Sequence, residues 1–319
     1  MHFPASGVDV SPFIPPLVAF AISLFTSTGG VSGAFLILPF QMSVLHFTSP
    51  AVSATNQLYN IVAIPSGVWR YVREGRMVWP LTWVVIAGTL PGVLIGAIFR
   101  VRYLPDPARF KLFAGVVLLY IGGRLLRDLL SKRKGALDAT AAEERFQALV
   151  RRYREAGGNG PGRAGQAMPR VAVKRFTPSR IAYEFYGEVF DFSTPGIFAL
   201  SFVVGVVGGV YGIGGGAIIA PFFVAFFGLP VYTVAGAALM GTLITSVAGV
   251  LFYQAIAPFY PGLAVAPDYP LGLLFGIGGM AGMYLGARLQ KHLPAKAIKG
   301  MLAAVILFMA VRYIAEFLR

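Results

Sequence analysis

The sequence contains no cysteine and only three histidines. Without cysteine the chain has no disulfide framework, no cysteine-ligated zinc or iron–sulfur site and no thiol nucleophile. The histidines stand far apart, at His2, His46 and His292. We therefore expect no histidine-built metal site and no bound cofactor.

Charged residues are also scarce. Only 13% of the residues are charged and 56% are hydrophobic, with a mean hydropathy of +0.71. Soluble domains carry about 25% charged residues because their surfaces face water. Much of this chain must therefore face lipid, and its 39 glycines and 22 prolines are typical of helical membrane bundles.

Apolar runs fill the chain on both sides of a polar middle segment. A helix that crosses a membrane needs about 20 residues, and six of the runs are long enough. The first two runs on each side are shorter and are separated by glycine. The predicted fold is an all-α polytopic membrane protein with glycine-broken short helices. The runs are 13–28, 33–47, 51–72, 78–100, 107–127, 195–211, 216–228, 231–256, 270–288 and 296–317.

The two sides are homologous repeats. One constant offset aligns glycines, prolines and aromatic residues of the first half with the same residue types in the second, and a slightly larger offset applies after an insertion near 258–270. So many coincidences indicate an ancestral duplication, an architecture that secondary transporters often use. The aligned pairs include Gly30 with Gly212, Gly33 with Gly215, Pro39 with Pro221, Gly67 with Gly249, Gly88 with Gly278 and Gly92 with Gly282.

The relative orientation of the repeats depends on the distribution of basic residues. Arg70, Arg73 and Arg76 mark one loop as cytoplasmic, whereas the corresponding segment 254–269 has neither Lys nor Arg. This difference favours inverted repeats. Basic residues that follow the fourth run in both halves favour parallel repeats instead, so the alternative stays open, and we expect inversion.

A strongly basic segment separates the repeats. Residues 131–181 hold 12 of the 27 Lys and Arg residues and four acidic residues. The positive-inside rule predicts a cytoplasmic insertion rather than nucleic-acid binding, and anionic lipid is its natural contact. A capping box at 140–143 predicts a helix, and 171–176 and 181–192 predict short strands. The predicted organisation is a first membrane repeat at 1–130, a basic cytoplasmic insertion at 131–192 and a second membrane repeat at 193–319.

Two glycine-rich turns, at 26–33 and 208–216, occupy corresponding places in the repeats. Irregular backbone inside a membrane is tolerated where it is buried in protein or lines a cavity. A helix that restarts after such a break presents unpaired N–H groups, which bind anions without a charged side chain. The alternative is that the glycines only allow close packing. The expected donors are the backbone N–H groups of Ser32, Gly33 and Ala34 and of Gly214, Gly215 and Gly216.

Polar side chains in the apolar runs are few, and we expect some of them to complete this site. Buried amides are costly unless they are paired, which favours a pore-lining role for the three amides of the third run. Hydroxyls have the alternative of bonding to the backbone of their own helix. The candidates are Thr28 beside the first turn, Asn56, Gln57 and Asn60 in the third run, and Thr242, Thr245 and Ser246 in the equivalent region of the second repeat.

Carboxylates are absent from the middle of every apolar run. Intramembrane carboxylates usually carry proton coupling, so a carboxylate relay is not supported. The runs also contain no nucleophile–base pair and no paired acids. We expect that the protein is not an enzyme.

The glycine-rich break after a first apolar run, the proline six residues beyond it and the repetition of both resemble the TauE/SafE family of sulfite exporters and related permeases. The second-repeat motif, 212–216 with Pro221, looks typical of that family, whereas the first repeat departs from it with Val31 and Ser32 in place of Ile and Gly. The resemblance covers both membrane repeats and leaves out the insertion. It implies a multi-pass secondary transporter in the cytoplasmic membrane that moves sulfite, a sulfonate or another small sulfur-containing anion by alternating access.

Two alternatives to this function stay open. One is an anion channel, and the other is a membrane-embedded enzyme or assembly factor that acts on a sulfur metabolite. The expected partners are the small anion and the lipid bilayer, with no nucleic acid. The sequence does not set the substrate, the direction, the coupling ion or the oligomeric state, so a homodimer also stays open.

Overall fold

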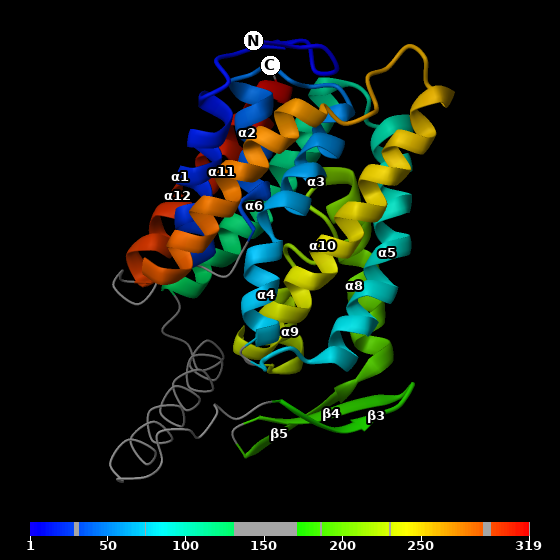
Figure 1. Ribbon diagram of the computed structural model, residues 1–319, viewed down its shortest axis with the longest axis vertical. Helices are drawn as coiled ribbons and strands as arrows, with labels where there is room; N and C mark the ends of the chain where they lie inside the picture. Colours follow the sequence, from blue (N-terminus) through cyan, green and yellow to red (C-terminus); the bar gives the residue numbers. More distant parts are fainter. Residues whose placement is uncertain are drawn as a thin grey trace.

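The computed structural model describes residues 1–28, 32–73, 75–130, 171–185, 187–229, 231–289 and 295–318. It is mostly helical with two small sheets, which confirms the predicted fold class (Figure 1). The first half contains α1 (Ile14–Thr28), α2 (Ala34–Ser43), α3 (Ala51–Ala63), α4 (Pro65–Arg73), α5 (Trp79–Arg102) and α6 (Pro107–Leu130). The second half contains α8 (Thr194–Tyr211), α9 (Ala220–Phe227), α10 (Val231–Ile256), the 3-10 turn η1 (Ala257–Phe259), α11 (Tyr269–Leu289) and α12 (Ala295–Leu318).

The long helices are suited to a membrane. Among the described residues, four helices are long and apolar enough to cross one: Trp79–Arg102, Thr194–Tyr211, Thr233–Phe259 and Gly300–Leu318. Two expectations need correction. The run 51–72 is divided into α3 and α4, because Pro65 has no N–H to continue the helix. The run 195–211, expected to be short, forms the 18-residue helix α8.

The two halves run in opposite directions (Figure 1). α1 starts at the end of the molecule where both chain termini lie, whereas α8 starts at the other end, beside the strands β3 to β5. In each half the chain then turns back through a short helix, α2 or α9. The orientation expected from the basic residues is therefore the one present.

The halves exchange a helix. α5 of the first half packs on α8 and α10, and α11 of the second half packs on α1 and α3. We call α1, α3, α4 and α11 the first bundle, and α5, α8 and α10 the second bundle. The remaining long helices, α6 and α12, pack on each other, and α3 contacts α10 where the two bundles meet. Every one of these contacts has a counterpart in the other half, as a pseudo-twofold axis requires.

Glycines at a spacing of four residues allow the exchanged helices to pack closely. On α5, a Cβ at Gly92 would collide with the Phe202 carbonyl of α8. On α11, a Cβ at Gly282 would collide with the Phe20 carbonyl of α1. Small residues at helix contacts are the usual device for backbone approach in membranes. These glycines therefore serve packing.

A three-stranded antiparallel sheet covers one end of the bundle. It consists of β3 (Ala172–Phe176), β4 (Arg180–Phe185) and β5 (Glu188–Ser193), in that order. The strands agree with the sequence prediction, and Gly187 supplies a positive φ of 81° at the β4–β5 turn. The helix expected near residue 140 lies outside the described residues. A hairpin of β1 (His2–Phe3) and β2 (Val8–Asp9) stands at the other end.

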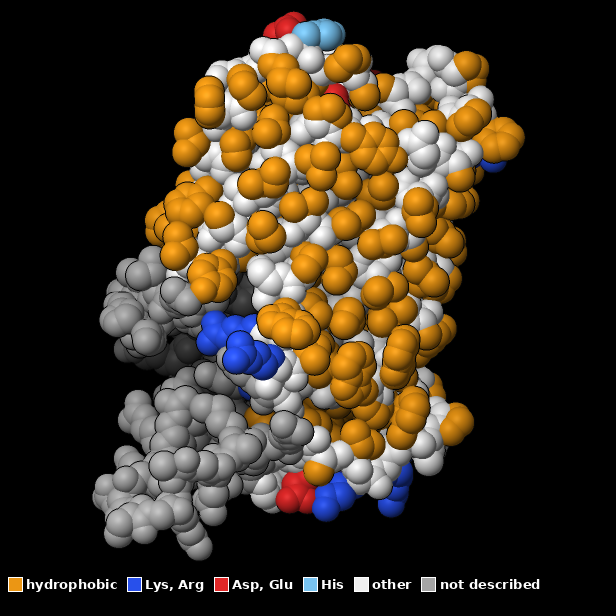
Figure 2. Space-filling model, viewed as in Figure 1, with side chains coloured by type: hydrophobic (Ala, Val, Ile, Leu, Met, Phe, Trp, Pro, Cys, Tyr) orange, Lys and Arg blue, Asp and Glu red, His pale blue; other side chains and the backbone are white. Residues whose placement is uncertain are grey.

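The surface and the interior have opposite character. Hydrophobic side chains cover the flank of the bundle. In this view Lys and Arg side chains lie mainly in the half that carries the sheet, and basic atoms are also visible at the edge of the opposite end (Figure 2). Buried polar side chains gather instead around the two glycine turns. They include Ser23, Ser32, Asn56, Asn60, Thr89, Thr242, Thr245 and Ser246, all without exposed surface or nearly so.

Candidate functional site

The second glycine turn connects α8 to α9. Gly212 and Gly214 have positive φ angles of 82° and 76°, which favour glycine. The N–H groups of Gly212 and Ile213 both donate to the Gly208 carbonyl and so close the end of α8. Every residue from 211 to 220 is buried. The sequence therefore forms a compact irregular segment inside the bundle.

The first glycine turn connects α1 to α2, and residues 29–31 within it are not described. The Ser32 hydroxyl donates to Asn60 Oδ1 at 2.8 Å and accepts from the Ala34 N–H at 3.3 Å. Gly33 lies against Tyr59, whose hydroxyl would be 2.7 Å from a Cβ at that glycine. The described part of this turn is thus held by side chains of α3. The side chain of Thr28, a predicted site residue, lies outside the description.

Two asparagines of α3 join the turns to each other. The Asn56 amide donates to the Ala34 carbonyl of the first turn and to the Gly212 carbonyl of the second, both at 3.0 Å. The Asn60 amide donates to the Ile213 carbonyl at 2.9 Å. Both asparagines are fully buried. The two segments that are far apart in sequence therefore meet at one helix.

Three hydroxyl side chains of α10 face the second turn. Thr245 Oγ1 accepts from the Gly215 N–H at 3.0 Å, and Ser246 Oγ accepts from the Asn60 amide at 3.3 Å. Thr242 and Thr245 also donate to carbonyls of their own helix, at 2.8 and 2.7 Å. Both threonines therefore bond to the backbone of their own helix, the alternative considered for hydroxyl side chains, and Thr245 also contacts the turn.

The turns are closed in this conformation. The N–H groups of Ala34 and Gly215, which the sequence assigned to anion binding, point at the hydroxyls of Ser32 and Thr245. A Cβ at Gly215 would collide with Thr89 of α5. Close packing, the alternative weighed for these glycines, therefore applies to this conformation, and an anion would have to displace hydroxyl oxygens.

Several buried polar atoms of α2 and α3 have no hydrogen-bond partner within the described part of the chain. They include Asn56 Oδ1 and both amide atoms of Gln57. Gln57 packs on Gly249 of α10, where a Cβ would collide with its amide oxygen. Gln41 of α2, which the sequence reasoning missed, is equally buried and unpartnered. No signal marks it, because it is a single amide near the end of a short run.

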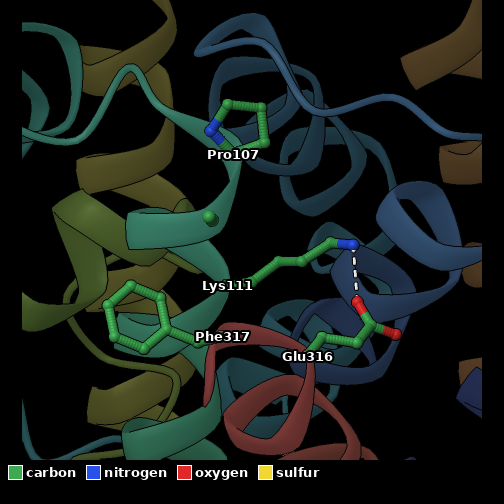
Figure 3. Close-up of a pocket in the computed structure, with 5 residues that line it drawn as sticks. Pro107, Lys111, Glu316 and Phe317 are labelled. Atoms are coloured by element: carbon green, nitrogen blue, oxygen red, sulfur yellow. Dashed lines mark hydrogen bonds and ion pairs between the residues drawn. The ribbon is translucent and has the colours of Figure 1, made fainter. Parts of the chain in front are cut away.

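A cavity of about 190 Å³ lies between α6 and α12, away from these turns (Figure 3). Its lining includes Lys111 and Glu316, whose Nζ and Oε2 atoms form an ion pair at 2.7 Å. The ammonium group of Lys111 is thus already paired with a carboxylate, which also pairs with Arg312. Across the described residues, no three His, Asp or Glu side chains gather closely enough to hold a metal ion.

Comparison with known proteins gives one match. A family model described as "Sulfite exporter TauE/SafE" matches residues 16–313, which extend from α1 to α12. No curated protein and no solved structure matches the chain.

Proposed function

Because the chain belongs to the TauE/SafE sulfite exporter family, we propose that it is a secondary transporter that carries sulfite or a similar small sulfur-containing anion through the paired glycine turns. The family consists of membrane transporters. The particular anion and the alternating-access mechanism are our inference. The proposal that the anion passes through the turns rests on one observation, the meeting of both turns at Asn56 and Asn60 of α3.

The hydrogen bonds of these asparagines divide between the bundles. Those to Ser32 and Ala34 stay on the side of α3, within the first half. Those to Gly212, Ile213 and Ser246 cross to the second bundle or to the turn that ends α8. A rocking motion between the bundles breaks only the crossing bonds. It frees both amide N–H groups of Asn60 and one amide N–H group of Asn56 for an arriving anion, while Asn56 keeps its bond to the Ala34 carbonyl.

The anion would be recognised by neutral donors. The amides of Asn56 and Asn60 and the N–H groups of Ala34 and Gly215 exchange their present acceptors for the oxygens of the anion. Hydrogen bonds to a charged acceptor are roughly twice as strong as neutral ones, which favours this exchange. The positive ends of α2 and α9 add to the attraction. Neither turn sequence, 26–33 or 208–216, contains Lys or Arg, which allows the anion to leave again.

The sheet end of the molecule is the proposed cytoplasmic side. Arg70 and Arg73 of α4 and Lys174, Arg175 and Arg180 of the sheet lie at this end, together with the basic insertion in the chain order. The positive-inside rule supports the proposal that this end faces the cytoplasm. We propose the cytoplasmic membrane as the location of the protein.

The test is flux of radiolabelled sulfite in proteoliposomes, with Asn60→Leu as the test variant. The change removes the amide that links α3 to the second turn and keeps the branched shape of the side chain. We expect flux to fall at least tenfold, the order expected for the loss of hydrogen bonds to a charged group. The control is Ser53→Ala, which removes another α3 hydrogen bond to the second half, from Ser53 to the Val210 carbonyl. Equal flux in both variants would refute the role of the turns.

Exchange in proteoliposomes, current recording and turnover in detergent separate the alternative functions. A carrier shows saturable exchange between two compartments and no single-channel currents. Conversion of a sulfur compound by the protein in detergent, without compartments, would favour an enzyme. Substitution of Gly215 is a poorer test, because any side chain there collides with Thr89 and disturbs folding.

A further inference from the structure

A guanidinium group is buried near the end of α5. Arg100 has no exposed surface. Its Nη1 donates to the Leu104 carbonyl and its Nη2 to the Thr48 carbonyl, the latter at 3.0 Å. The group also lies over the Phe110 ring, 3.7 Å from the ring centre. Its Nε–H has no acceptor within the described part of the chain.

The charge of Arg100 is not balanced by a carboxylate. No acidic oxygen of the described residues forms an ion pair with it. Asp106 accepts from the Arg109 N–H, and Asp268 accepts from Ser6 and from the Leu271 N–H. A buried charge without a counter-charge is costly, so an anion that reaches it is strongly favoured.

A second unsatisfied donor stands next to this charge in the chain. Ser49 directly follows Thr48, the residue whose carbonyl Arg100 holds. The Ser49 hydroxyl is buried and has no partner among the described groups. The Nε–H of Arg100 and the hydroxyl of Ser49 are thus two donors that the fold brings into one region and leaves without acceptors.

Arg100 lies between one end of the molecule and the second glycine turn. Its neighbours on α5, Ala97 and Val101, pack in one cluster with Tyr253 of α10. The Tyr253 hydroxyl donates to the Gly209 carbonyl in the last turn of α8, at 3.3 Å. Arg100 is therefore connected through this cluster and Tyr253 to the end of α8 that leads into the second turn.

We propose that Arg100 and Ser49 form a second anion site, at the end of the bundle opposite the sheet, for a small oxyanion such as sulfite or sulfate. The site takes one oxygen on the Arg100 Nε–H and another on the Ser49 hydroxyl. It relays the anion to or from the glycine turns. The role of this site in transport rests on the proposed function, whereas the binding of an anion at the site does not.

Equilibrium binding of radiolabelled sulfite to the purified protein tests this site. The test variants are Arg100→Gln and Ser49→Ala, and the matched control is Arg102→Gln, which removes an exposed arginine from the same end of α5. We expect two classes of site in the unmodified protein. Arg100→Gln abolishes one class, Ser49→Ala weakens it about tenfold or more, and Arg102→Gln leaves both classes unchanged.

Ser49→Ala guards against a folding artefact. Arg100 also ties the carbonyls of Thr48 and Leu104 together, so its loss could unfold the region. Removal of an unpartnered buried hydroxyl costs no hydrogen bond and leaves the thermal stability of the sulfite-free protein unchanged or raised. Sulfite binding identical to the unmodified protein in Ser49→Ala and Arg100→Gln would overturn the proposal.

The proposed function fails in a different way. If the glycine turns do not carry the anion, Asn60→Leu keeps normal flux, whatever the binding at Arg100. If the turns carry the anion but Arg100 does not bind it, Asn60→Leu loses flux while Arg100→Gln binds sulfite as the unmodified protein does. The two results are measured on separate variants in separate assays.

Discussion

Individual side chains decide how the turns are held, and the asparagines of α3 have the largest part. Asn56 and Asn60 use every amide hydrogen bond visible in the structure to fix backbone carbonyls or a hydroxyl. Glycine turns have no side chains with which to fix themselves, so their geometry must come from neighbours. A change at one of these neighbours therefore acts on the whole turn.

Thr245→Val tests whether the turn's N–H groups bind anion. Valine keeps the shape of the side chain and removes the acceptor of the Gly215 N–H. We expect a loss of about 1–3 kcal/mol of stability without anion, because a buried donor is left unpaired. Sulfite should then raise the melting temperature of this variant more than that of the unmodified protein, since the freed N–H gains an acceptor only from the anion.

The control for this measurement is Thr242→Val, one turn earlier on α10, where the hydroxyl donates only to its own helix. Thr242→Val should change neither the stability without anion nor the sulfite-induced rise in melting temperature by much. A smaller sulfite-induced shift in Thr245→Val than in the unmodified protein would contradict anion binding at the Gly215 N–H.

The sequence indicated which polar residues gather at the turns, but it indicated less about the contacts that they make there. Most of the amides and hydroxyls singled out on the third run and its counterpart lie at the turns, since burial of a rare polar residue leaves few other places for it. The exception is Gln57, which packs on Gly249 of α10. What they bind stays a prediction. Arg100 was expected only as a charge at the end of a run. Its burial depends on the loop after α2 folding over it, which no local pattern indicates.

At the scale of elements, the sheet is attached firmly to the second half. The Tyr183 hydroxyl of β4 shares a hydrogen bond of 2.6 Å with Thr233 of α10. Phe192 of β5 packs edge-on against Phe227 of α9. The Val171 N–H donates to the Gly75 carbonyl between α4 and α5. The sheet thus contacts segments of both halves at one end of the bundle.

Tyr183→Phe should loosen this attachment. Burial raises the pKa of the Tyr183 phenol well above its ordinary value of 10.0. Because the folded pKa exceeds the unfolded one, the stability from this group is complete below about pH 10 and declines as the pH rises above it. The variant should lose about 1 kcal/mol at neutral pH and show a weaker decline at alkaline pH. Thermal unfolding at pH 7 and pH 10.5 measures both effects, and equal alkaline decline in both proteins would contradict the expectation.

The strands themselves were predictable, whereas their docking was not. Alternation of apolar residues and the glycine at the turn indicated β3 to β5 from local sequence alone. The contact with α9 and α10 depends on where those helices begin relative to the sheet. Periodicity carries no information on such long-range placement.

For the whole molecule too, the sequence predicted the orientation of the repeats but not the packing of their helices. Arginines on one loop indicated inverted repeats, and the repeat alignment indicated which helices correspond. Neither indicates that α5 packs on helices of the second half and α11 on helices of the first. Correspondence in sequence does not say which helices pack on each other. The exchange of these helices matters for the motion we propose, in which the two bundles rather than the two sequence repeats are the moving units.

Engineered disulfides can distinguish these two kinds of motion, and the chain has no native cysteine to interfere. A Cβ at Gly241 of α10 would lie 3.9 Å from the Val85 Cβ of α5, and a Cβ at Gly236 of α10 would lie 3.1 Å from the Tyr71 Cβ of α4. Disulfides need about 3.5–4.5 Å, so the first pair fits and the second requires a small opening. The first pair joins the repeats within one bundle, and the second joins the two bundles.

We expect oxidation of the Tyr71→Cys/Gly236→Cys pair to stop sulfite flux in proteoliposomes and reduction to restore it. Oxidation of the Val85→Cys/Gly241→Cys pair should leave flux within about twofold, because α5 and α10 move as one body. The single-cysteine variants control for the substitutions themselves. If the Val85–Gly241 disulfide also stops flux, the sequence repeats are the moving bodies, since that link joins the repeats and leaves the bundles free.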